Sequence, residues 1–365
     1  MAGRVAASGL AERLRDLIRE NGPISIADYM QICLADDRAG YYKTRDPFGE
    51  KGDFVTAPEI SQMFGELIGV WLRMVWQETG RPRPFHLVEL GPGRGTLMAD
   101  ILRAAGGDAH WQSAVQLHLV ETSPRLRAHQ KERLSSSPLS GSWHDTLDTV
   151  PDGPVHLVAN EFFDALPVRQ WVRVRAGWSE RVVGLDAQGH LVFGLRPAPQ
   201  SVCPDDLPRD PPAVGDVLEF SPVRNACARE IGRRIADAGG TALIIDYGHP
   251  RTAYGDTVQA VADHRTVPVL QDPGNADLTA HVDFDAFARA CRQEGIHTSA
   301  LMTQADFLLS LGLLERAGRL GHGKDQETQR SIEDAVERLA GPDQMGHLFK
   351  VLCLHDRDVP PFPFR

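Results

Sequence analysis

Residues 86–96 read HLVELGPGRGT, an apolar run that ends near an acid and passes directly into closely spaced glycines. The run is typical of a strand that is covered on both faces in a parallel sheet. A helix is predicted over 96–105, where leucine, methionine and isoleucine recur at helical spacing. A glycine-rich turn between such a strand and such a helix lies at the crevice where doubly wound sheets bind ligands. The stretch therefore predicts an α/β fold with a nucleotide site at this turn.

The same alternation of strand and helix continues along the chain. Further apolar runs suited to buried strands lie at 116–121, 155–161, 241–247 and 347–356. Helices are predicted between and beside them. One runs from Glu59 to Glu78, where apolar residues recur every three or four positions, and one from Ser221 to about Ala238, with Pro222 in its first turn and Gly239 at its end. A short strand is predicted near Ile296. Strand, helix and strand in repetition imply a parallel, doubly wound sheet.

The long connections indicate insertions. The segment from Glu161 to Thr241 exceeds one crossover, and its two alternating stretches predict an inserted antiparallel hairpin. The predicted organisation is an N-terminal helical cap and loop over 1–80, then a sheet domain over 81–365 with insertions at about 172–220 and 250–280.

Composition excludes several classes of protein. The 365 residues are 42% apolar and carry a net charge of −10, which argues against a general nucleic-acid binder. Five scattered cysteines without Cys-x-x-Cys spacing indicate neither a disulfide framework nor a zinc site, so no metal is predicted. No apolar window is long enough to span a membrane, and the N-terminus carries acids where a signal peptide needs an apolar core. We therefore expect a cytoplasmic protein without membrane insertion.

The glycine turn favours S-adenosylmethionine over NAD. Gly91, Gly93 and Gly95 form Gly-x-Gly-x-Gly, and Thr96 stands where a dinucleotide fingerprint has its third glycine or alanine. Glu89, two residues before the first glycine, can face the ammonium group of a methionine moiety, whereas it would repel a pyrophosphate.

Other candidate cofactor contacts follow neighbouring strands. Glu121 ends the next strand and can accept both ribose hydroxyls, as acids at this position also do in NAD enzymes; a solvated loop acid is the alternative. Trp143 offers a stacking ring for adenine, or else is a core residue. The remaining candidates are Thr122, His144, Asp145, Asn160, Glu59 and Ser61. For the last two, a simple helix start at 56–61 is the alternative.

Six long motifs carry a resemblance to a known family. They are GYYKTRDPFGEKGDFVTAPEISQMFGELIG (40–69), VELGPGRGTLMADIL (88–102), VETSPRLRAHQ (120–130), ANEFFDALPVRQW (159–171), ALIIDYGH (242–249) and DPGNADLTAHVDF (272–284). On these motifs the chain resembles the MidA-like family of S-adenosylmethionine-dependent methyltransferases. The resemblance implies a seven-stranded class I methyltransferase sheet with an antiparallel last strand and a family-specific subdomain. The family's mitochondrial member is an arginine methyltransferase that assists assembly of respiratory complex I, so the resemblance implies a protein substrate, possibly a respiratory NADH dehydrogenase subunit. For a eukaryotic source it would also imply the mitochondrial matrix, although no transit peptide is evident.

Four residues are candidates for catalysis. An arginine acceptor is cationic, so carboxylates must orient its guanidinium. Glu161 and Asp164 follow the fourth strand, where the methyl group would project, although Asp164 could instead cap the next helix. Asp246, near the end of the fifth strand, could form a second wall of the pocket. His281 could face the acceptor from the inserted loop, unless that motif only starts the helix after Asp283.

Three functional hypotheses remain at this point. The leading one is a protein arginine methyltransferase. A small-molecule methyltransferase is the second, and the third is an assembly factor that binds a partner protein and uses the cofactor only for stability.

Overall fold

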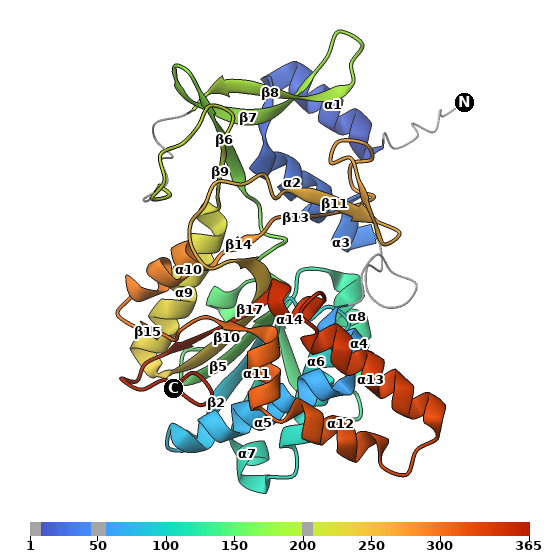
Figure 1. The fold of residues 1–365 in the computed structure, drawn as a ribbon, viewed down its shortest axis with the longest axis vertical. Helices are drawn as coiled ribbons and strands as arrows, with labels where there is room; N and C mark the ends of the chain where they lie inside the picture. The colour runs from blue at the N-terminus through green and yellow to red at the C-terminus, as the bar shows by residue number, and fades with distance from the viewer. Residues whose placement is uncertain (1–8, 45–55, 199–206) are drawn as a thin grey trace, which may run out of the picture.

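The largest sheet holds the strands that the sequence predicts in the central part of the chain. The computed structural model describes residues 9–44, 56–198 and 207–365. Within them the sheet runs β15-β17-β10-β5-β2-β3-β4, and it fills the lower half of Figure 1. These strands span His297–Thr298, Phe349–His355, Gly240–His249, Val155–Asn160, Phe85–Leu90, Val115–Val120 and Gly141–His144, in that order.

The predicted α/β class is confirmed, with one difference in strand count. β2, β3, β4, β5 and β10 are parallel, and β17 runs antiparallel to β10. The described sheet has nine strands rather than seven. The strand expected near Ile296 is divided into β15 and β16 (Met302–Thr303), and the two-residue β14 (Val282–Asp283) also pairs with β10.

Helices cover both faces of this sheet because each presents an apolar side to it. α5 (Gln62–Glu78) and α6 (Thr96–Ala105) share one core with the sheet. α9 (Pro222–Ala238) and α10 (Phe284–Arg292) share a second core on the other face. The helix expected from Glu59 onward is broken in two, since Ser61 is extended and separates α4 (Ala57–Ile60) from α5.

The N-terminal helices belong to a separate core formed with the insertions. Here β1 (Ile24–Ser25) pairs antiparallel with β7 (Gly177–Leu185), so the start of the chain joins the inserted hairpin. Leu14 and Tyr29 pack with Val183 and Leu278. The upper half of Figure 1 shows this second unit. Its other elements are α1 (Leu10–Asn21), α2 (Ile26–Ala35), α3 (Tyr41–Thr44), β6 (Arg169–Val174), β8 (Leu191–Pro197), β9 (Val217–Phe220), β11 (Gln259–Ala262), β12 (Arg265–Val267) and β13 (Asp277–Thr279).

The segment predicted as one N-terminal cap, 1–80, is thus divided. Its first helices pack on the insertions, whereas α5 packs on the large sheet. The rest of the described chain forms α7 (Ala109–Ala114), α8 (Pro124–Arg133), η1 (Leu147–Thr149), α11 (Gln304–Ser310), α12 (Leu313–Gly321), α13 (Gln326–Ala340) and α14 (Met345–Leu348).

A search of the described ranges finds no helix long and apolar enough to cross a membrane. The same ranges contain no group of three or more His, Cys, Asp or Glu side chains that could hold a metal ion.

Candidate cofactor and acceptor site

The glycine turn after β2 adopts backbone angles that are unfavourable for residues other than glycine. Gly91, Gly93 and Gly95 have φ values of 60°, 52° and 77°, which lie in the left-handed region. A Cβ atom on Gly91 would lie 2.7 Å from Cδ2 of Phe162. The turn can therefore approach β5 closely only because position 91 has no side chain.

A pocket of about 390 Å³, counting the space at its open mouth, lies between this turn, α4 and the end of β5. Six of the predicted site residues line it. They are Glu59, Glu89, Gly91, Gly93, Asn160 and Glu161, and the pocket also includes Thr56, Pro58, Pro92, Arg94, Thr96 and Leu97. Glu59 is fixed there by a hydrogen bond from the Thr96 hydroxyl.

Glu89 is a buried acid in the pocket whose carboxyl group is poorly compensated. Its side chain is only 3% exposed, and Oε2 has no hydrogen-bond partner in the described chain. Burial, with the nearby Glu121 carboxylate, raises the pKa of Glu89 to about 8. Asn160 is also buried and its Oδ1 likewise has no partner among the described residues. Such buried acceptors fit a ligand that brings N–H donors and positive charge, as the ammonium and sulfonium groups of S-adenosylmethionine would.

Glu121 lies behind the glycine turn, where α8 holds its carboxylate. Oε1 accepts a hydrogen bond from the Ser123 amide at 2.8 Å, and Oε2 accepts one from Nε2 of Gln130 at 3.3 Å. Burial raises the pKa of Glu121. Thr122 is exposed, and its carbonyl oxygen accepts from Nζ of Lys43 at 2.7 Å.

Gln130 is a residue that the sequence analysis missed. It is fully buried, it donates to the Gly93 carbonyl at 2.8 Å, and its Oε1 accepts from Nε1 of Trp143 at 2.8 Å. Gln130 therefore connects the glycine turn, Glu121 and Trp143, the ring predicted to stack on adenine. The only sequence signal was its place in the motif at 120–130, because an isolated polar residue on a helix does not reveal its tertiary contacts.

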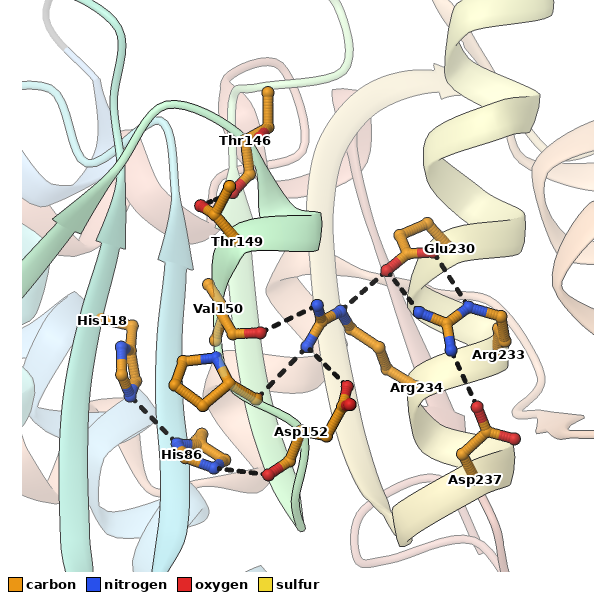
Figure 2. A network of polar contacts seen from close by, with 11 residues as sticks. His86, His118, Thr146, Thr149, Val150, Asp152, Glu230, Arg233, Arg234 and Asp237 are labelled. Carbon is orange, nitrogen blue, oxygen red and sulfur yellow. Dashed lines mark hydrogen bonds and ion pairs between the residues drawn. The ribbon is translucent and has the colours of Figure 1, made fainter.

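The residues predicted to contact adenine, His144 and Asp145, form hydrogen bonds or ion pairs with other side chains. Nε2 of His144 lies 3.0 Å from Nδ1 of His118, and its Nδ1 lies 3.1 Å from the Thr149 hydroxyl. Figure 2 shows that His118 in turn contacts His86, and Nε2 of His118 lies 3.0 Å from Nδ1 of His86. Burial lowers the pKa of His118 to about 4, so its ring is neutral at neutral pH. Asp145 is exposed and forms an ion pair with Arg127 at 2.7 Å.

Glu161 lines the pocket in an unusual backbone conformation. Its φ is 50°, and its Oε1 accepts from the Ala57 amide at 3.1 Å and from Nδ2 of Asn160 at 3.0 Å. Burial raises the pKa of Glu161 to about 7, and the negative charge of Asp164 adds to the rise. A non-glycine residue held in this region by surrounding contacts is typical of functional sites.

Asp164 lies just beyond the residues that line the pocket. It is 6% exposed, and its Oδ1 has no hydrogen-bond partner in the described part of the chain. Its carboxylate is hydrogen-bonded to the Tyr247 side chain, and burial raises its pKa. His281 packs its ring edge-on against Tyr247, with 5.5 Å between the ring centroids. Burial lowers the pKa of His281.

Two predicted site residues occupy structural positions instead. Asp246 is completely buried beneath the turn after β5, and its carboxylate accepts from the amides of Phe163 at 2.9 Å, Asp164 at 3.2 Å and Tyr247 at 2.9 Å. All three donors are backbone amides. Asp246 is not among the residues that line the pocket. Ser61 caps α5 by accepting from the Met63 amide, and it does not line the pocket either.

Comparisons with known proteins agree with this geometry. Residues 67–302 match the family model described as "Putative S-adenosyl-L-methionine-dependent methyltransferase". The human "Protein arginine methyltransferase NDUFAF7, mitochondrial" is 38% identical over 362 residues, which cover 92% of this chain and 81% of that protein. The Drosophila melanogaster homologue of that name is 36% identical, over 94% of this chain and 84% of its own.

A solved structure shows the same fold with a cofactor product. It is that of a "likely methyl transferase from Burkholderia thailandensis bound to S-adenosyl-homocysteine", with a TM-score of 0.81 and 29% sequence identity, covering 95% of this chain and 91% of that one. The cofactor is therefore S-adenosylmethionine, as the glycine turn and the unpartnered Glu89 oxygen indicated. The chain belongs to this family of S-adenosylmethionine-dependent methyltransferases.

Proposed function

We propose that this enzyme is a protein arginine N-methyltransferase whose acceptor is an arginine of a respiratory NADH dehydrogenase subunit. The names of the human and fly relatives support the arginine part of the proposal. The resemblance described above supports the acceptor protein. The proposal also implies a location where that subunit is made or assembled, which is the mitochondrial matrix or a bacterial cytoplasm.

The observation that carries the proposal is the pair of carboxylates after β5, of which Glu161 is partly buried and Asp164 is buried. Glu161 lines the cofactor pocket, and Asp164 follows three residues later with an oxygen, Oδ1, that has no hydrogen-bond partner among the residues described. Burial raises the pKa of both carboxyl groups, and the charge of the nearby Arg224 offsets this only in part at Asp164. Neither carboxylate forms an ion pair within the part of the chain that the structure describes. A bound guanidinium would supply that missing cation, and its N–H groups match carboxylate acceptors.

Each of these residues would have a distinct task. Bound S-adenosylmethionine supplies a methyl group that is already activated for transfer. Glu161 would align one guanidinium nitrogen with it, and Asp164 would hold the far side of the guanidinium so that the nitrogen cannot turn away. Methylation of a guanidinium nitrogen releases one proton, and Oε2 of Glu161 can accept it because the pKa of this group lies near 7.

The test replaces Glu161 by glutamine, which keeps the shape and one acceptor but removes the charge. S-adenosylmethionine affinity should stay within about threefold, because that group is held mainly by the glycine turn and Glu89. Turnover should fall by about two to three decades, which corresponds to the loss of about 2–4 kcal/mol of transition-state stabilisation. Glu20→Gln, an exposed carboxylate on α1, is the matched control.

The assay measures tritiated methyl transfer from S-adenosylmethionine to proteins extracted from cells that lack this enzyme. Amino-acid analysis of the labelled protein should find methylarginine. Label in another amino acid would refute the arginine acceptor, and equal rates for wild type and Glu161→Gln would refute the carboxylate clamp. Binding of a partner protein without any labelling would favour the assembly-factor hypothesis.

A further inference from the structure

A buried arginine on α9 holds the turn that carries the two acceptor carboxylates. Arg224 is 6% exposed. It donates from Nε to the Phe163 carbonyl at 2.6 Å and from Nη2 to the Asp164 carbonyl at 3.0 Å. The same guanidinium donates from Nη1 to the His281 carbonyl at 2.7 Å and from Nη2 to the Ala280 carbonyl at 2.8 Å. One side chain thus binds four backbone carbonyl groups in two loops that are far apart in sequence.

The turn after β5 is bound from its other side by the carboxyl group of Asp246. Asp246 accepts hydrogen bonds from the amides of Phe163 and Asp164, the same two residues whose carbonyls bind Arg224. The turn therefore lies between a buried carboxyl group, which accepts from its amides, and a buried guanidinium, which donates to its carbonyls. Residues 163 and 164 cannot shift without breaking hydrogen bonds on both sides, and those from the guanidinium are charge-assisted.

The second loop held by Arg224 belongs to the insertion that packs on the N-terminal helices. Ala280 and His281 follow β13, and the Ala280 amide also donates to the Asp164 carbonyl at 3.0 Å. The His281 ring packs against Tyr247, which in turn is hydrogen-bonded to the Asp164 carboxylate. Arg224 thus fixes both the carboxylate turn and the inserted loop that faces it.

We propose that Arg224 is a positioning residue for methyl transfer, which aligns the acceptor carboxylates with the inserted loop through their backbone carbonyls. This inference rests on the proposed acceptor role of Glu161 and Asp164. Arg224 is not among the residues that line the cofactor pocket, so its effect is on alignment. A guanidinium is required, because the four carbonyls lie around its planar group and the single ammonium nitrogen of a lysine could not reach all of them.

The same helix offers a matched control in Arg234. It is also 6% exposed and also donates to backbone carbonyls, to Val150 at 3.0 Å and Pro151 at 3.4 Å, besides binding Glu230 at 2.8 Å. Figure 2 shows Arg234 reaching from α9 toward Val150 and Asp152, in a network that also includes His86. Arg224→Lys and Arg234→Lys therefore remove the same guanidinium fork from two comparable sites on one helix.

The first measurement is the transfer assay described above, with S-adenosylmethionine affinity and unfolding temperature recorded for both variants. Both should lose thermal stability. Arg224→Lys should lower turnover about 10-fold to 100-fold, the effect expected when a reacting group moves by about an ångström, with cofactor affinity within about threefold. Arg234→Lys should keep wild-type turnover. Equal turnover losses in the two variants, or none in Arg224→Lys, would overturn the proposal.

The second measurement is hydrogen exchange, which needs no acceptor. In Arg224→Lys the amides of residues 161–165 and those of 279–283 should lose protection together, whereas in Arg234→Lys both segments should exchange as in wild type. Independent behaviour of the two segments would overturn the proposal even if no acceptor is labelled. If label appears on an amino acid other than arginine, the proposed function fails, but the comparison of Arg224→Lys with Arg234→Lys still decides the positioning role.

Discussion

At the scale of single residues, the cofactor site sets two carboxylates of like charge close together. Glu89 lies near the end of β2 and Glu121 directly follows β3, the adjacent parallel strand, and the Glu121 carboxylate raises the electrostatic cost of ionising Glu89. Glu121 is the better stabilised of the two, because Ser123 and Gln130 donate hydrogen bonds to it. Glu89 has no such donor at Oε2 among the described residues, and so it is the group that gains most from a cationic ligand.

Replacing Glu121 by alanine should weaken cofactor binding without unfolding the protein. If Glu121 accepts from the ribose hydroxyls as the sequence predicts, the variant loses hydrogen bonds to an uncharged group, which should cost about 1–3 kcal/mol, or about one to two decades in affinity. It also removes the like charge beside Glu89, so the loss should lie toward the lower end of this range. Calorimetric titration with S-adenosylmethionine measures the effect. An unchanged dissociation constant in a folded Glu121→Ala protein would show that Glu121 serves only α8.

Residues of the site differ in how far the sequence could predict them. Glu89 and the glycines were predictable because their signal is local: a strand, a turn and a helix follow one another within eleven residues. Gln130 and Arg224 were not, because each acts only where three distant segments meet. Asp246 was assigned to the pocket wall from its place at a strand end, yet its side chain turns under the neighbouring loop.

At the scale of elements, α9 depends on its N-terminal cap. Oγ of Ser221 accepts from the Arg224 amide at 3.1 Å and donates to the Pro167 carbonyl at 2.6 Å. Ser221→Ala should lower the free energy of unfolding by about 2–3 kcal/mol, because it removes the cap and leaves a buried carbonyl without its donor. Urea denaturation measures this loss.

Thr303→Ala is the comparison for that cap. Thr303 caps α11 by accepting from the Asp306 amide at 3.1 Å, but its hydroxyl donates to an exposed Asp306 carboxylate. Only the cap is lost there, so a decrease of about 1 kcal/mol is expected. A Ser221→Ala loss no larger than the Thr303→Ala loss would contradict the contribution assigned to the Pro167 hydrogen bond.

Element boundaries were predictable where a local rule decides them. The start of α9 at Pro222 and its end before Gly239 follow from capping preferences, and both were confirmed. The break between α4 and α5 was not predicted, because the apolar period continues across Ser61 while the backbone there is extended. Tertiary packing decides that break, since the Ala57 amide at the start of α4 donates to the Glu161 carboxylate.

At the scale of the whole molecule, the proposed acceptor site lies where two units with separate cores meet. The large sheet supplies the cofactor pocket and Glu161, while the loop after β13 comes from the unit that contains the N-terminal helices. Which insertion the N-terminal helices would contact could not be predicted from sequence, because β1 is only two residues long and pairs with a strand far along the chain. Several buried acids lie together at the end of the large sheet that faces the second unit.

These buried acids should make the stability of the ligand-free protein depend on pH. Burial raises the pKa of Glu89 from 4.5 to about 8 and that of Glu161 from 4.5 to about 7, and it raises the pKa of Asp164 and Asp246 as well. A raised pKa means that the folded state binds more protons than the unfolded state between the two values. The contribution to stability is therefore complete below about pH 4.5 and is lost as pH rises through 7 and 8.

S-adenosylmethionine should reverse that loss, because its positive groups favour the ionised form of the nearby carboxylates. We expect the increase in unfolding temperature on adding saturating S-adenosylmethionine to be larger at pH 7.5 than at pH 5.5, and binding at pH 7.5 to release protons to the buffer. In Glu89→Gln the increase should be smaller, and its difference between the two pH values should shrink, because the group that titrates highest in the pocket has been removed. Differential scanning fluorimetry measures the first effect, and calorimetry in buffers of different ionisation enthalpy measures the second. An equal increase in unfolding temperature at both pH values in the wild type would mean that Glu89 is not the partner of the cofactor's charge.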